Sequence, residues 1–95
     1  MSTTRDEYTT KMKLQLDELN RNIDTLEAKV NEAKEDVRQK YREELVKARR
    51  ESKLAMDKFG ELKTAGEESW DKMMAEMEKI RDAFVRSFQY FKSQV

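Results

Sequence analysis

The chain has 95 residues, of which 42% are charged, and its 20 basic and 20 acidic side chains cancel to no formal net charge. This length allows one small domain, and so polar a composition leaves material only for a narrow core. A balanced charge excludes the strong overall field that draws basic proteins to nucleic acid. Cysteine and histidine, the side chains most used in nucleophilic, acid–base and metal-ligand chemistry, are absent. We therefore expect no enzymatic activity, no catalytic or metal site and no cofactor.

Apolar or small residues recur every three or four positions from Tyr8 to Val95, which is the spacing of one face of an α-helix. Proline is absent and glycine occurs only twice, so little in the composition interrupts a helix. The predicted fold class is therefore all-α. A lone helix cannot bury such a stripe, so each helix must meet another in the same chain or in a partner.

Residues 1–4 are expected to form an N-terminal tail and cap. Thr4 and Glu7 have the spacing of a capping box, so a helix should begin near Arg5. The apolar spacing then runs through residues 5–59 and predicts one long coiled-coil helix that ends near residue 60. The seam in the first half of this helix is the predicted oligomer interface, formed by Leu16, Leu19, Ile23, Leu26, Val30 and Val37.

Both glycines fall within residues 60–67, which are predicted to form a hinge or turn because glycine readily ends a helix in the left-handed conformation. A shorter helix is expected over about residues 67–94. As a segment of the chain, residues 68–95 are assigned to this aromatic and methionine-rich amphipathic helix. The two helices together define a predicted hairpin core or partner face: Tyr41, Leu45, Phe59, Trp70, Met73, Met77, Ile80, Phe84, Phe88 and Phe91.

Two features favour an antiparallel hairpin of these helices. Folding back near residue 63 places small residues of the first helix, such as Ala48, opposite bulky ones of the second, such as Ile80. Residues 36–60 hold eight basic and five acidic side chains, whereas residues 61–82 hold four and seven. Residues 5–35 would then have no partner in their own chain, so a homo-oligomer is expected. The alternative is one continuous helix in a multi-stranded coiled coil, since the stripe keeps its phase across the glycines.

The local distribution of charge bears on whether the chain binds nucleic acid or a membrane. Glutamates interrupt the basic stretch of residues 38–53, which favours a salt-bridged face over a nucleic-acid site. The aromatic face of residues 70–95 fits either core packing or a membrane surface, and the acidic residues between 67 and 82 oppose anionic lipid. No stretch has the length and apolarity to span a bilayer, and the first twenty residues do not resemble a signal peptide. A cytoplasmic location is expected.

Several segments resemble small bacterial coiled-coil proteins of a stress-response family: RDEY at 5–8, KMK at 11–13, QLDE at 15–18, IDTLEAK at 23–29 and AGEESW at 65–70. The resemblance covers most of residues 5–75, although the phenylalanine-rich tail departs from it. It implies a coiled coil with a stress association and no defined activity. The sequence as a whole predicts a non-enzymatic oligomerisation or scaffold protein. The alternatives are a peripheral membrane protein acting through residues 70–95 and an accessory subunit of a larger complex.

Overall fold

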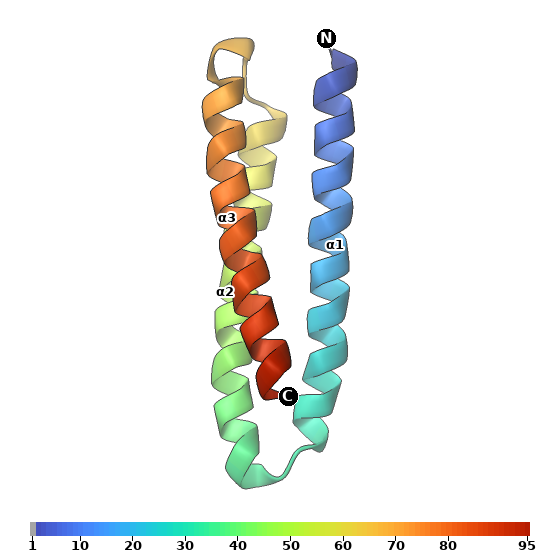
Figure 1. Cartoon of the computed structure of the whole chain (residues 1–95), viewed down its shortest axis with the longest axis vertical. Coiled ribbons are helices and arrows are strands. Elements are labelled where there is room, and N and C mark those ends of the chain that lie inside the picture. The colour runs from blue at the N-terminus through green and yellow to red at the C-terminus, as the bar shows by residue number, and fades with distance from the viewer. Residues whose placement is uncertain (1) are drawn as a thin grey trace.

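In the computed structural model, the described residues 2–95 form three α-helices: α1 (Ser2–Glu32), α2 (Glu35–Lys63) and α3 (Glu67–Gln94). The helices run down, up and down in the view of Figure 1 and form an elongated bundle of 52 × 18 × 17 Å. The all-α prediction is confirmed. The prediction of two helices is wrong, because residues 2–95 hold three, and the alternative of one continuous helix fails for the same reason.

The unpredicted break lies at Ala33 and Lys34, where the chain reverses between α1 and α2. Neither residue is a helix breaker, and the apolar stripe keeps its phase across them, so the sequence carries no glycine or proline signal for this turn. Val30 and Arg38 hold the turn. The Ala33 amide donates to the Val30 carbonyl at 3.0 Å, and the Arg38 guanidinium donates through Nε and Nη2 to the Ala33 carbonyl at 3.2 and 2.9 Å. Residues 5–35 therefore do have a partner in their own chain.

The second reversal lies at residues 64–66. Thr64 follows the last turn of α2, and its amide and hydroxyl both donate to the Glu61 carbonyl, at 3.2 and 3.1 Å. Gly66 is the N-cap of α3, with an extended backbone at φ −75° and ψ 169°. Neither Gly60 nor Gly66 has the left-handed conformation expected from the sequence. Gly60 lies inside α2 and does not end it.

The predicted start of the first helix is also wrong. α1 begins at Ser2 rather than near Arg5, so Thr4 lies inside the helix.

One apolar core runs along the axis between the three helices. Its buried members are Met12, Leu16, Ile23, Leu26, Val30, Ala48, Ala55, Phe59, Leu62, Met77, Phe84, Phe88 and Phe91. α2 contributes small buried side chains, Ala48, Ser52 and Ala55, so its neighbours can approach closely. α3 contributes only large buried side chains, Met77, Phe84, Phe88 and Phe91, whereas α2 adds Phe59 and Leu62 near its end.

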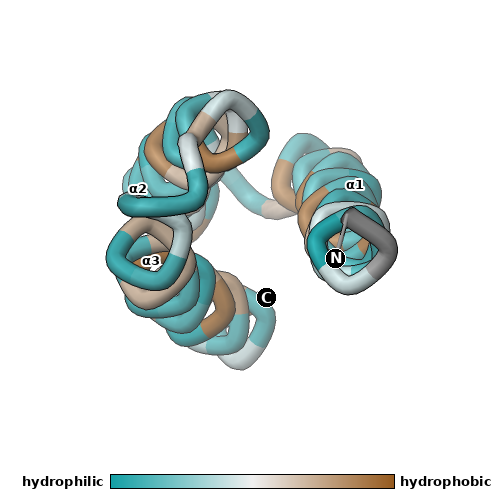
Figure 2. The backbone as a smooth tube through the Cα atoms, turned by 90° about the horizontal axis from the view of Figure 1, so that it is seen from above, coloured by the Kyte–Doolittle hydropathy of each residue, from teal (hydrophilic) through white to brown (hydrophobic). Residues whose placement is uncertain are grey.

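The three helix pairs are not equally close. α2 packs most extensively on α3 and less on α1, while α1 and α3 touch least. Seen along the bundle axis, α2 and α3 lie against each other and α1 stands apart from α3 (Figure 2). α1 and α3 are therefore the least closely packed pair, and the candidate site lies between them.

Candidate functional site

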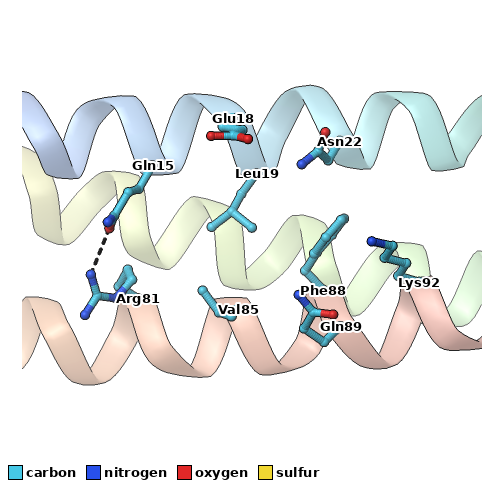
Figure 3. A pocket seen from close by; sticks show the side chains of 9 residues that line it. All are labelled: Gln15, Glu18, Leu19, Asn22, Arg81, Val85, Phe88, Gln89 and Lys92. Atoms are coloured by element: carbon cyan, nitrogen blue, oxygen red, sulfur yellow. Dashed lines mark hydrogen bonds between the residues drawn. The ribbon is translucent and has the colours of Figure 1, made fainter.

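A groove of 420 Å³ lies between α1 and α3. Four side chains of α1 and five of α3 line it: Gln15, Glu18, Leu19, Asn22, Arg81, Val85, Phe88, Gln89 and Lys92. Figure 3 shows Leu19 projecting from α1 into the gap, with Val85 and Phe88 below it on α3. A hydrogen bond of 2.8 Å from Arg81 Nη1 to Gln15 Oε1 bridges the two helices at one end of the groove.

The groove combines an apolar floor with charged rims. Leu19 and Val85 are half-buried, so both retain apolar surface that the chain does not cover. Glu18 stands on the α1 rim, while Arg81 and Lys92 stand on the α3 rim. An apolar strip bordered by opposite charges fits the side of an amphipathic helix. Its open shape and largely polar lining are less typical of a small-molecule site, which is concave and mostly apolar.

One end of α1 is fastened to the turn between α2 and α3. The Arg5 guanidinium lies 4.2 Å from the centroid of the Trp70 ring and donates through Nη2 to the Ala65 carbonyl at 2.8 Å. Tyr8 packs edge-on against Trp70, with ring centroids 5.7 Å apart, and its hydroxyl donates to Glu78 at 3.3 Å. Burial of the phenol and the adjacent Glu78 carboxylate raise the pKa of Tyr8 to about 12. These contacts close the bundle at this end.

Polar contacts also set the register of α1 on α2. Ser52 is 8% exposed, and its hydroxyl donates to Asn20 Oδ1 at 2.5 Å. Arg49 Nη2 contacts Asp24 at 2.7 Å and Glu27 at 2.6 Å. Burial alone would lower the pKa of Arg49, but the hydrogen bonds to the two carboxylates outweigh it and raise the pKa. α1 is therefore held on α2 by both apolar and ionic contacts.

A single ion pair joins α2 to α3 among the described residues, and Lys58 provides it. Its Nζ lies 3.0 Å from Glu76 and 3.2 Å from Glu61. The hydrogen bonds to these carboxylates raise the pKa of Lys58, and the bond to Lys58 lowers the pKa of Glu76. The basic segment 36–60 and the acidic segment 61–82 are thus joined by one direct ion pair, Lys58 with Glu76.

The residues predicted as an oligomer interface are divided by the structure. Leu16, Ile23, Leu26 and Val30 are buried in the chain's own core. Leu19 is half-buried and lines the groove, and Val37 is 39% exposed near the start of α2. Most of the predicted interface residues are therefore buried within the single chain. Leu19 is the one that also lines the groove.

The residues predicted as a hairpin core or partner face all belong to the core region. Phe59, Met77, Phe84, Phe88 and Phe91 are buried, and the half-buried residues packed against them include Tyr41, Leu45, Trp70, Met73 and Ile80. Trp70 and the phenylalanines of residues 70–95 are therefore turned inward in the folded chain, whereas Tyr90 is 52% exposed. No helix within residues 2–95 is both long and apolar enough to cross a membrane.

Sequence reasoning missed the groove and the Arg5–Trp70 contact, because both depend on how α1 folds back on the other helices. In the sequence, the polar residues that line the groove are recognisable only as neighbours of the apolar stripe. Within residues 2–95 no cluster of acidic side chains is arranged to hold a metal ion. Comparison with known proteins finds no matching family model, no matching curated protein and no matching solved structure.

Proposed function

We propose that this chain is a non-enzymatic helical association protein that pairs with a second copy through the α1–α3 groove. The observation that carries the proposal is the apolar surface that Leu19 and Val85 leave half-exposed on the floor of the groove, beside the buried Phe88 ring. In a pair of copies whose grooves face each other, these side chains would cover one another, and burial of that apolar surface is the driving force.

The charges on the rims support a second copy as the occupant. A two-fold axis parallel to the bundle would lay the α1 rim of one copy over the α3 rim of the other. Glu18 of each chain would then face the basic rim of its partner, which carries Arg81 and Lys92. Such a contact is self-complementary and closes at two copies, as most homo-oligomers do.

The test compares two valines. Val85 lines the groove, whereas Val46 is 54% exposed on α2 and is not among the groove residues. Val85→Glu should abolish association because it places a charge on the apolar floor. Val46→Glu, with the same change in charge and size, should associate like the wild type.

Analytical ultracentrifugation measures the mass of each variant, and circular dichroism confirms that each remains helical. Equal association of the two glutamate variants would refute the groove as the contact. If the wild type stays monomeric but binds an added amphipathic helix in a Val85-dependent way, the accessory-subunit alternative replaces self-association.

A further inference from the structure

The turn between α1 and α2 has few of the features that fix a helix boundary. Lys34 occupies the N-cap position but makes no side-chain capping bond, and the backbone there is ordinary, with φ −63° and ψ 150°. Alanine and lysine are both strong helix formers, and within residues 2–95 no residue has a positive φ. The acidic pair Glu35 and Asp36 in the first turn of α2 is the main local feature that favours a helix start here.

A continuous helix through this point would satisfy the backbone and preserve the apolar stripe. Val30, Ala33 and Val37 are spaced by three and four residues, so a straight helix keeps all three on one face. The Lys34 carbonyl already accepts the Arg38 amide at 2.8 Å, which is the helical i to i+4 bond. The Ala33 carbonyl now accepts from the Arg38 side chain, and straightening would give it the Val37 amide instead.

The surface that α1 covers on α2 and α3 can accept an identical α1 from another chain. α1 buries Leu16, Ile23 and Val30 completely against the rest of the bundle. Its polar contacts, such as Asn20 with Ser52, would form equally well between chains. Exchange of an identical element keeps these contacts and replaces one turn with helix, which makes it a low-cost route to a dimer.

We propose that α1 exchanges between two copies of the chain. The Ala33–Lys34 turn straightens, α1 and α2 become one helix of about 62 residues, and α1 of each copy packs on α2 and α3 of the other. The two long helices run antiparallel and meet at their midpoints, so the dimer is elongated end to end. In the exchanged dimer each groove lies between α1 of one copy and α3 of the other, with the same lining as in the single chain. The exchange therefore does not require pairing of two grooves.

Glu35→Pro tests the exchange directly. Glu35 is the first residue of α2, where proline is well tolerated, and Lys34 already has the extended backbone that a residue before proline requires. The same proline inside a continuous helix is unfavourable by roughly 100-fold per chain. Glu35→Ala is the matched control, because it removes the same charge but permits a continuous helix.

Each variant is unfolded, refolded at high concentration and analysed by light scattering and small-angle X-ray scattering. Wild type and Glu35→Ala should give an elongated dimer, and Glu35→Pro should form that dimer at least 100-fold more weakly while remaining a folded monomer. Equal dimer formation by the proline and alanine variants, or an exclusively monomeric wild type, would overturn the exchange.

A second measurement separates the exchange from association through the groove. Asn20→Cys and Ser52→Cys are combined in one chain, which contains no other cysteine, and the isolated dimer is treated with a short thiol crosslinker. Exchange links the two chains covalently, whereas groove pairing links each chain only to itself. The elongated dimer should also persist when Val85→Glu is added. Crosslinks confined to single chains would refute the exchange and leave the groove unaffected.

Discussion

At the scale of single residues, the aromatic side chains of α3 decide between a core and a membrane-binding face. Phe84 and Phe91 are both 0% exposed, and Met77 lies with them in the same core. A membrane-surface role would require these rings to leave the core, since an inserting face must be accessible to lipid. The packing therefore favours a structural role for this face in the folded chain.

Phe84→Ala should destabilise the protein by about 3–5 kcal/mol, because it removes a buried ring and leaves a cavity. Urea unfolding followed by circular dichroism measures the change. Tyr90→Ala is the control on the same helix, as Tyr90 is 52% exposed and its truncation should alter stability by less than about 0.5 kcal/mol. Unchanged stability of Phe84→Ala, together with lost binding to anionic vesicles, would favour the membrane alternative.

Tyr8 should give the fold a distinctive sensitivity to alkali. Its folded pKa is about 12 against an ordinary value of 10.0, so the folded state binds the phenolic proton more tightly than the unfolded state does. The stability that this provides is complete below pH ~10 and is lost as the pH rises towards ~12. Tyr8→Phe cannot ionise and should lose less stability across this window than the wild type, as measured by the melting temperature at several pH values. All other ionisable groups are the same in the two proteins, so equal losses would contradict the assignment.

At the scale of elements, α1 differs from the other helices because its contacts with the rest of the bundle vary along its length and between its two neighbours. It is fastened at one end by Arg5 and Tyr8, lies on α2 along its length and contacts α3 sparsely. Its N-terminal turns therefore depend on a few polar and aromatic contacts.

Arg5→Ala should loosen the start of α1. The change removes the hydrogen bond to the Ala65 carbonyl and the contact with Trp70, together worth about 1–2 kcal/mol at a half-buried position. Hydrogen–deuterium exchange should rise in the first three turns of α1 and stay unchanged in α3. Lys11→Ala removes one exposed positive charge from the same helix and should leave exchange as in the wild type. A uniform increase along all three helices would contradict a local role for Arg5.

The elements were predictable where the sequence contains a local signal. Helix was expected nearly everywhere from the period of the stripe, and glycine marked the segment in which the second reversal occurs at residues 64–66. The turn at Ala33 and Lys34 has no glycine or proline, and the Lys34 side chain makes no capping bond. The turn arises because folding back buries Leu16, Ile23 and Val30 within one chain. Stability gained from packing between helices cannot be recognised in a short stretch of sequence.

The candidate site was predictable only in part, for the same reason. The stripe correctly identified apolar positions that need cover, and Leu19 among them lines the groove. Which of those positions stay partly uncovered depends on the unequal spacing of the helices. Val85 and the charged rims could be recognised only once α1 was placed beside α3.

At the scale of the whole molecule, the bundle is slender, with two dimensions of 18 and 17 Å, and has a correspondingly narrow core. Small cores leave modest stability, and association is a common way to supplement it. Balanced charge adds little net repulsion between copies. These properties are compatible with reversible pairing of copies, which is the function proposed for the groove.

Sedimentation equilibrium of the wild-type chain across a wide concentration range tests the proposed self-association most directly. The monomer mass is 11.4 kDa. We expect the weight-average mass to rise with concentration towards twice that value, while the helical circular dichroism signal per residue stays constant. A mass that remains at 11.4 kDa at every concentration, with full helicity, would contradict the proposal that the chain functions by pairing with itself.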